Sequence, residues 1–264
     1  MDLGLKDRVA IVGGSSKGIG YAVAVSLALE GAAVTLVARH GDELEQAAAE
    51  LRAATGSEQV LTVTADLSDP GDIERVYAAA IERFGKVDIT LNNLGGPRPG
   101  ELEAFTDDQW QAAFDLNFSS AVRLNRLVID GMRERKFGRI ISVLSKTIKE
   151  PEDRLGLSTV ARTALSSYSK LLAQEVAADG ITVNAVLPGS VNTGRLQSVI
   201  VAQAKANGRS VEEQTTVRKA SVPAGRFGEP TEVGGLIAFL ASEQAGYITG
   251  QNIAVDGGQI KGLS

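Results

Sequence analysis

The chain has 264 residues, 44% of them hydrophobic and 22% charged, which is enough to bury the core of one large α/β domain. It contains no cysteine and only one histidine, His40, which excludes disulfides, a thiolate nucleophile and a metal site built from cysteine or clustered histidine. Its net charge of -5, its lack of a long apolar run and its start MDLGLKDR predict a cytoplasmic protein that binds neither nucleic acid nor membrane.

The first predicted element is a buried strand at residues 9–12, which ends in the glycine cluster of the stretch GGSSKGIG. An apolar helix follows as far as Gly31, so strand, glycine turn and helix come in the order of a phosphate-binding βα unit. Glycines let the backbone approach a pyrophosphate, and the helix N-terminus offers free N–H groups. A plain turn before a buried helix also uses glycine, so this stretch alone fits both readings.

The rest of the chain alternates between the two kinds of element. Further strands are predicted at residues 33–38, 60–64, 87–91, 139–144, 182–187 and 252–255, and helices at 42–55, 69–84, 107–135, 155–178 and 231–241. This alternation predicts right-handed crossovers and a doubly wound parallel sheet with helices on both faces, in one domain spanning residues 1–264. Residues 192–228 have weak periodicity and are either a substrate loop or lid, or a surface excursion with two helical turns.

The residues at the end of the second predicted strand indicate which dinucleotide the chain would bind. In a dinucleotide-binding fold an acidic residue there binds the ribose hydroxyls of NAD, whereas a basic residue suits the 2′-phosphate of NADP. Here the strand ends in Ala38, Arg39 and His40, and Lys17 lies in the glycine loop. Arg39 and Lys17 could hold a phosphate through charge-assisted hydrogen bonds, or they could be two solvated surface cations. The position favours NADP(H) over NAD(H).

Short motifs after the strands carry a resemblance to a known family. They are GGSSKGIG, Ala65-Asp66-Leu67, Asn92-Asn93-Leu94-Gly95, Leu187-Pro188-Gly189, and near the C-terminus YITGQ followed by VDGG. In this order and spacing they resemble the short-chain dehydrogenases/reductases over essentially the whole chain, and most closely their 3-oxoacyl-ACP reductase branch. Gly13 departs from the pattern, because the family usually has threonine there.

The resemblance implies a Rossmann fold and an NADP(H)-dependent oxidoreductase that moves hydride to or from a small carbonyl or alcohol, a 3-oxoacyl compound being one candidate. It also implies a homodimer or homotetramer. The cofactor-binding positions it implies are Gly14, Ser16, Lys17, Gly18, Ile19, Gly20 and Arg39 around the phosphates, Asp66, Leu67, Asn93 and Gly95 on the adenosine side, and Pro188, Gly189, Val191 and Thr193 near the nicotinamide.

The catalytic positions depart from the family. Its members use a tyrosine as proton donor, a lysine that lowers the pKa of that tyrosine, a serine and an asparagine. Asn117 and Ser145 match the asparagine and the serine, but the family spacing puts Ser158 at the tyrosine position and Arg162 at the lysine position. A serine hydroxyl is too weak an acid to replace a phenol. Arginine can hold ribose hydroxyls and add charge, but it cannot relay a proton.

A proton donor must therefore come from elsewhere if the protein is an enzyme. Tyr168 and Lys170 do not restore the pair, because they are two residues apart and cannot share a helix face. The charged loop after Ser145 offers Lys146, Lys149 and Glu150 as displaced acids, or it is a loop whose charges face water.

Three functional hypotheses follow. The first is an oxidoreductase with an atypical active site formed by Ser145, Asn117, Ser158 and Arg162. The second is a catalytically silent NADP-binding protein that acts as a sensor or as the non-catalytic subunit of a mixed assembly. The third is a scaffold that has lost the cofactor.

Overall fold

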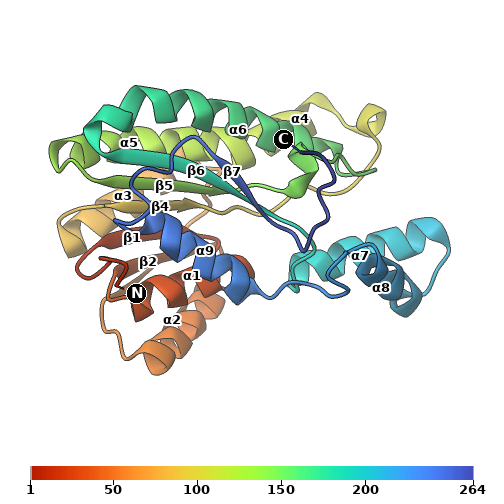
Figure 1. The fold of residues 1–264 in the computed structure, drawn as a ribbon, viewed down its shortest axis with the longest axis horizontal. Coiled ribbons are helices and arrows are strands. Elements are labelled where there is room, and N and C mark those ends of the chain that lie inside the picture. Colours follow the sequence, from red (N-terminus) through yellow and green to blue (C-terminus); the bar gives the residue numbers. More distant parts are fainter. Residues whose placement is uncertain (1, 264) are drawn as a thin grey trace.

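The computed structural model describes residues 2–263, and in this part of the chain seven parallel strands form one sheet (Figure 1). In chain order they are β1 (Val9–Gly13), β2 (Ala33–Ala38), β3 (Val60–Thr64), β4 (Ile89–Asn92), β5 (Gly138–Val143), β6 (Ile181–Pro188) and β7 (Asn252–Val255). Their spatial order is β3-β2-β1-β4-β5-β6-β7, and every neighbouring pair is parallel. The predicted doubly wound parallel sheet is confirmed.

Helices cover both faces of this sheet, as Figure 1 shows. On one face α1 (Gly18–Leu29), α2 (Gly41–Thr55) and α9 (Pro230–Ala241) pack on the strands and form one apolar core. On the other, α3 (Pro70–Phe84), α5 (Ser120–Glu134) and α6 (Gly156–Val176) form a second core. Because both faces are covered, the central strands β1, β5 and β6 are fully buried, and most of their residues are apolar.

Local sequence sets several helix ends. Pro70 is the first residue of α3, and the carboxylate of Asp69 caps the helix by accepting a hydrogen bond from the Asp72 N–H at 3.0 Å. Short 3₁₀ turns lie at Leu102–Ala104, Lys146–Ile148 and Ala177–Asp179.

Among residues 2–263, none of the helices is long and apolar enough to cross a bilayer.

The helix predicted at residues 107–135 is interrupted. It consists of α4 (Asp107–Phe114), a π-helical turn at Asp115–Ser119, and α5. One extra residue per turn shifts the helix face, and such π turns are frequent at functional sites. Asn117 lies in the middle of this turn and is buried. Because the π turn leaves no mark in the apolar periodicity, the sequence predicted one continuous helix here.

The chain order reverses between β1 and β4, because β1 pairs with β2 on one side and with β4 on the other. In open α/β sheets the carboxyl ends of the strands at such a reversal border a crevice. The glycine turn after β1 and Asn93 after β4 lie at this place.

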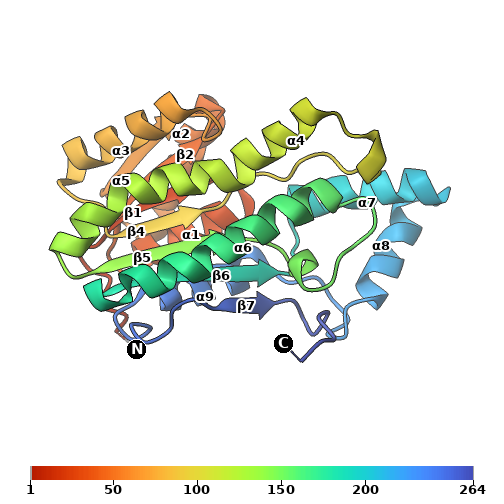
Figure 2. The ribbon, with the colours of Figure 1, turned by 90° about the horizontal axis from the view of Figure 1, so that it is seen from above.

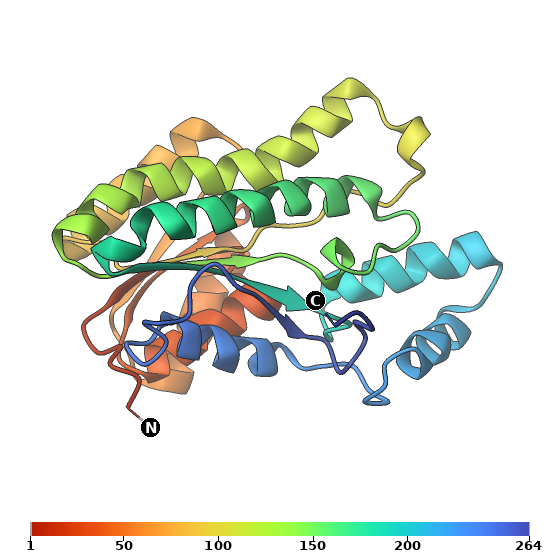
Figure 3. The same cartoon turned by 45° about the horizontal axis from the view of Figure 1, so that its top comes forward.

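Residues 192–228 contain two complete helices, α7 (Gly194–Asn207) and α8 (Val211–Ala220), so the alternative of a surface excursion with only two helical turns is wrong. Figures 2 and 3 show α7 and α8 side by side beyond the carboxyl ends of β6 and β7. Polar caps begin both helices: the Thr193 hydroxyl accepts from the Leu196 N–H at 3.3 Å, and Ser210 forms a capping box with Glu213. These caps were readable in the sequence, whereas the apolar face of each helix is too short to give a clear period.

Candidate active site

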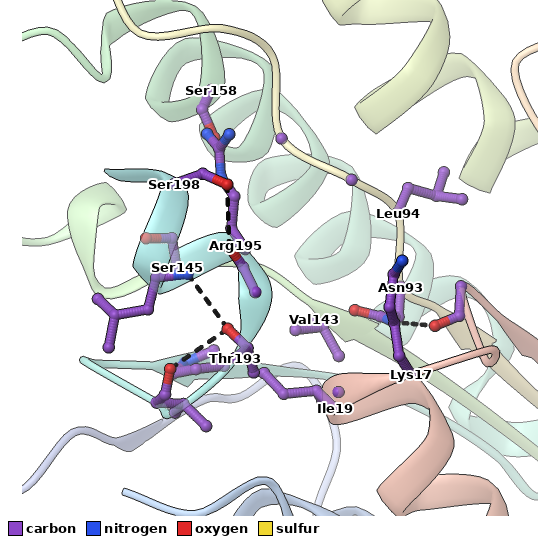
Figure 4. Close-up of a pocket in the computed structure, with 18 of the residues that line it drawn as sticks. Lys17, Ile19, Asn93, Leu94, Val143, Ser145, Ser158, Thr193, Arg195 and Ser198 are labelled. Atoms are coloured by element: carbon purple, nitrogen blue, oxygen red, sulfur yellow. Dashed lines mark hydrogen bonds between the residues drawn. The ribbon is translucent and has the colours of Figure 1, made fainter. Parts of the chain in front are cut away.

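A cavity of about 800 Å³ opens at the carboxyl ends of the strands, where the crevice was expected. It is lined by every predicted cofactor residue except Gly20, namely Gly14, Ser16, Lys17, Gly18, Ile19, Arg39, Asp66, Leu67, Asn93, Gly95, Pro188, Gly189, Val191 and Thr193. Ser145, Ser158 and Arg162 line the same cavity. Figure 4 shows Lys17, Ile19 and Asn93 towards one end, and Ser158 and Arg195 towards the other.

Two predicted site residues lie outside the lining. Asn117 sits behind Arg162, beside a small void that the two residues share, and its Nδ2 donates to the Ala113 carbonyl at 3.4 Å. Gly20 lies under the glycine turn, where a Cβ atom would be 2.2 Å from the Gly14 carbonyl oxygen. Gly20 therefore allows close packing of helix α1 on the turn and does not line the cavity.

The glycine turn is held by backbone geometry and by Asn93. Gly14 and Gly18 have φ angles of 58° and 63°, in the left-handed region that glycine adopts without strain. The Asn93 Nδ2 donates to the carbonyls of Gly13 at 3.1 Å and Gly14 at 3.4 Å. Asn93 was predicted on the adenosine side of the site; the structure also makes it the tie between the end of β4 and the turn.

Replacing Gly20 by alanine is expected to lower the free energy of unfolding by about 1–3 kcal/mol, because the new methyl group meets backbone atoms that must shift. The same shift displaces the turn, so affinity for a nucleotide falls as well. Urea unfolding measures the first effect. Gly235→Ala, in helix α9 with open space around its Cβ position, is the matched control and is expected to leave stability unchanged or slightly raised.

The N-terminus of α1 fits an anion. Its N-cap, Lys17, makes no side-chain capping bond, and the first turn holds no acidic residue. The first N–H groups of a helix have no partner within the helix, so here they stay available at the cavity wall together with the positive end of the helix dipole. The residues present therefore fit the phosphates of a dinucleotide.

Carboxylates accompany the two basic residues expected to bind a 2′-phosphate. Lys17 Nζ pairs with Glu43 Oε2 at 3.0 Å, and both side chains are exposed. The hydrogen bond and charge of Lys17 hold the pKa of Glu43 below its ordinary value. The hydrogen bonds from Ser68 lower the pKa of Asp66, and the nearby charge of Arg39 adds to this. Sequence reasoning missed Glu43, because it lies in the first turn of α2, beyond the end of β2.

The hydroxyl groups of Ser145 and Ser158 come from two different parts of the chain: Ser145 precedes the 3₁₀ turn after β5, and Ser158 lies in α6. The Ser145 Oγ accepts from the Thr147 N–H at 3.2 Å and from the Thr147 hydroxyl at 3.0 Å. The Ser158 Oγ, in a side chain that is only 6% exposed, accepts a hydrogen bond from Arg162 Nη1. Since both oxygens already accept, each hydroxyl proton is available to a third group.

Among residues 2–263, no acidic side chain forms an ion pair with Arg162. Its Nη1 and Nη2 donate to neutral oxygens, those of Ser158 and, at 3.3 Å, the Leu94 carbonyl. Its Nε is buried without a partner. Burial, together with the nearby charge of Arg195, lowers the pKa of Arg162 to about 10, so the group remains protonated at neutral pH.

The loop after Ser145 is not simply solvated. Lys146 is 8% exposed and lines the cavity, and its Nζ lies 2.5 Å from Glu152 Oε1. The alternative of a water-facing loop is therefore wrong for Lys146, whereas Lys149 is exposed and lies outside the lining. Glu150 also lies outside the lining, where it accepts from the N–H groups of Lys261 and Gly262.

Glu152 links this loop to α8. Arg218 donates to both Glu152 oxygens, at 2.8 and 3.1 Å, and its Nε donates to the Ser190 hydroxyl at 3.0 Å. Burial alone would raise the pKa of Glu152, but the hydrogen bonds and charges of Arg218 and Lys146 outweigh it and hold that pKa below its ordinary value. Sequence reasoning missed Glu152 and Arg218, which are far apart in the chain.

Tyr168 and Lys170 lie away from the cavity. The Tyr168 ring packs edge-on against Phe118 with 6.0 Å between ring centroids, and burial raises the pKa of its phenol. Lys170 donates to the Gly250 carbonyl at 3.0 Å. Neither residue lines the site.

Comparisons with known proteins agree with this architecture. A family model described as enoyl-(acyl carrier protein) reductase matches residues 14–259. The 3-oxoacyl-[acyl-carrier-protein] reductase of Escherichia coli K12 is 36% identical over 258 residues, which cover 97% of this chain and 98% of that protein. The acetoacetyl-CoA reductase of Shinella zoogloeoides is 34% identical over 254 residues, covering 96% and 98%. The crystal structure of L-sorbose reductase from Gluconobacter frateurii, complexed with NADPH and L-sorbose, superposes with a TM-score of 0.93 at 36% identity and full coverage of both chains.

Proposed function

The chain belongs to the short-chain dehydrogenase/reductase family, and from this premise we propose that it is an NADP(H)-dependent oxidoreductase acting on a small carbonyl or alcohol. The observation that carries the proposal is that one cavity joins the glycine turn and the end of β2 to Ser145, Ser158 and Arg162. A binding site for the nucleotide and a set of hydrogen-bond donors thus share one space, as a transfer between cofactor and substrate requires.

Support for the cofactor comes from the fit at the N-terminus of α1 and from the relatives. L-Sorbose reductase and an actinorhodin polyketide ketoreductase were both solved with NADPH. When bound, the nicotinamide supplies or takes up the hydride. In this chain Ser16, Lys17 and the N–H groups of α1 would hold its phosphates, and Arg39 its 2′-phosphate.

The two serines would bind the oxygen of the substrate. As hydride reaches the carbonyl carbon, negative charge develops on that oxygen, and hydrogen-bond donors already pointing at it lower the barrier. Ser145 and Ser158 can each donate one O–H, because Thr147 and Arg162 occupy their acceptor sides. Arg162 polarises the Ser158 hydroxyl through their hydrogen bond and places a positive charge directly behind it. In this proposal Ser158 and Arg162 replace the tyrosine and lysine of the family as an electrostatic pair.

The proton for the alkoxide would come from Lys146. Among the three charged residues considered in the loop, only Lys146 lines the cavity. An ammonium group is a stronger acid than a serine hydroxyl and can be restored from solvent after each turnover. Glu152 holds the Lys146 ammonium in place. In the oxidative direction the same amine would take up the proton.

Three further expectations belong to this proposal. Helices α7 and α8 would act as the lid of a single domain, since Thr193, Arg195 and Arg218 bring them to the cavity wall. From the family resemblance we expect a homodimer or homotetramer. We also expect a cytoplasmic enzyme.

The direct test follows NADPH absorbance while purified protein is offered a panel of ketones, oxo acids and 3-oxoacyl thioesters. We expect substrate-dependent NADPH oxidation, and loss of about 10²–10³-fold in kcat in Ser145→Ala. NADPH binding without turnover of any panel member would favour the catalytically silent alternative. That alternative arises because Ser158 and Arg162 stand where the family has its tyrosine and lysine.

Replacing Arg39 by alanine tests the cofactor preference. A charge-assisted hydrogen bond to a phosphate contributes about 1.5–3 kcal/mol, so NADPH affinity is expected to fall about 10–100-fold while NADH affinity changes little. Calorimetric titration gives both constants. Glu43→Gln, which frees Lys17 from its ion pair, is expected to act in the opposite direction and strengthen NADPH binding. Equal losses for both nucleotides in Arg39→Ala would show that Arg39 does not read the 2′-phosphate.

A further inference from the structure

Positive charge accumulates at the end of the cavity away from the glycine turn. Besides Lys17 and Arg39, four basic residues line the cavity, namely Lys146, Arg162, Arg195 and Arg218, and we call these four the cationic end. Besides Glu43 and Asp66, the lining holds one carboxylate, that of Glu152. Figure 4 shows Ser158 and Arg195 at this end, with Lys17 across the cavity. The phosphates of a dinucleotide would lie on the far side, near Lys17, Arg39 and the N-terminus of α1, so they do not account for this excess.

Two of the four cations share a single acid. Lys146 Nζ and both terminal nitrogens of Arg218 contact Glu152, and all three side chains are largely buried, with exposed fractions of 10%, 14% and 18% for Lys146, Arg218 and Glu152. Lys146 and Arg218 together carry two positive charges, and Glu152 neutralises only one of them, so one positive charge remains unbalanced. Buried charge without a partner is costly, so such an arrangement persists where a ligand completes it.

The other two cations, Arg162 and Arg195, pair with no carboxylate among the described residues. Arg162 donates only to Ser158 and Leu94, and Arg195 Nη2 donates to the Pro97 carbonyl at 2.9 Å. In the part of the chain that the structure describes, neither guanidinium forms an ion pair. Arg162 keeps a buried Nε without a partner, and burial together with the charge of Arg195 lowers its pKa. The two guanidinium groups repel each other until an anion lies between them.

From this cationic end we infer that the substrate is an oxo acid or its hydroxy acid, with a carboxylate close to the reacting carbonyl. The inference rests on the proposed function and names the substrate class of the same site. A planar carboxylate matches the fork of a guanidinium group, and Arg195 is the side chain best suited to hold it, because no acid or hydroxyl occupies it. A 3-oxoacyl thioester, by contrast, carries no charge beside its carbonyl and would leave these cations unpaired.

The test compares acids with their neutral esters by calorimetry, on free protein and on protein saturated with NADP⁺, which cannot reduce them. The pairs are 2-oxobutanoate and 3-oxobutanoate, each with its methyl ester. We expect at least one acid to bind about tenfold or more tightly than its ester, since a charged hydrogen bond is worth that much. In Arg195→Gln the acid should lose about tenfold in affinity and the ester should not.

Lys205→Gln is the matched control, because Lys205 is an exposed cation in the same helix, α7, outside the cavity lining. It should leave the acid preference intact. Esters that bind as tightly as their acids, an equal loss for acid and ester in Arg195→Gln, or no measurable binding of either acid would each overturn the inference. The NADP⁺ titration in the same experiment separates the two proposals: failure to bind NADP⁺ contradicts the proposed function, whereas NADP⁺ binding without acid preference contradicts only the substrate class.

Discussion

Replacing Lys146 by methionine is expected to lower kcat by about 10²–10⁴-fold, the range that a positioned general acid contributes. The methionine keeps most of the side-chain volume but removes the ammonium group that lines the cavity. Arg218 still pairs with Glu152 in this variant, so the anchor between the loop and α8 remains. Steady-state kinetics on the best substrate of the panel, with the NADPH dissociation constant and the melting temperature measured alongside, separate lost chemistry from lost structure.

Lys146→Arg distinguishes a proton donor from a fixed charge. Arginine retains the positive charge and can pair with Glu152, but it does not release a proton at neutral pH. We therefore expect kcat of the arginine variant to be nearly as low as that of the methionine variant. Recovery of kcat to within a few fold of wild type in Lys146→Arg would contradict the proton-donor role and leave Lys146 only an electrostatic one.

Replacing Arg162 by glutamine is expected to lower kcat by about 10²–10³-fold, the cost of removing a group that stabilises developing charge on an oxygen. Glutamine can still donate towards Ser158 but carries no charge. Because Ser158 and Arg162 act as a unit, the double change of Ser158→Ala with Arg162→Gln should cost little more than either change alone. Additive losses would show that the two side chains act independently.

Variants at Ser158 and Arg162 also distinguish the enzyme hypothesis from the hypothesis of a catalytically silent protein. If the wild type binds NADPH without turning over any substrate, Ser158→Tyr combined with Arg162→Lys supplies the tyrosine and lysine of the family. Appearance of activity only in that double variant would favour the catalytically silent alternative. Activity in the wild type that falls in Arg162→Gln supports the electrostatic pair.

The sheet and its site were predictable because the signals are local. Each strand is a short apolar run, each glycine turn follows such a run, and parallel strands bring their carboxyl ends to one edge. Arg39 could therefore be placed near the cofactor site from its position after β2, whereas Asp66 was placed there by the family resemblance. Both residues line the cavity.

The rest depends on contacts that no local pattern encodes. The ion pair of Lys17 with Glu43 and the network of Lys146, Glu152 and Arg218 join segments that become neighbours only after folding. The π turn around Asn117 changes the helix face without changing composition. Helices α7 and α8 carry recognisable caps but weak periodicity, so their residues at the cavity wall could not be chosen from the sequence.

The most direct test of the account is a calorimetric titration of the purified protein with NADPH and, separately, with NADH. It requires no knowledge of the substrate and reports on the glycine turn, the N-terminus of α1 and Arg39 together. We predict one NADPH per chain, bound at least about tenfold more tightly than NADH, as a charge-assisted contact to the 2′-phosphate requires. Failure of both nucleotides to bind would contradict the enzyme and the silent NADP-binding protein alike, and would leave a scaffold that has abandoned the cofactor.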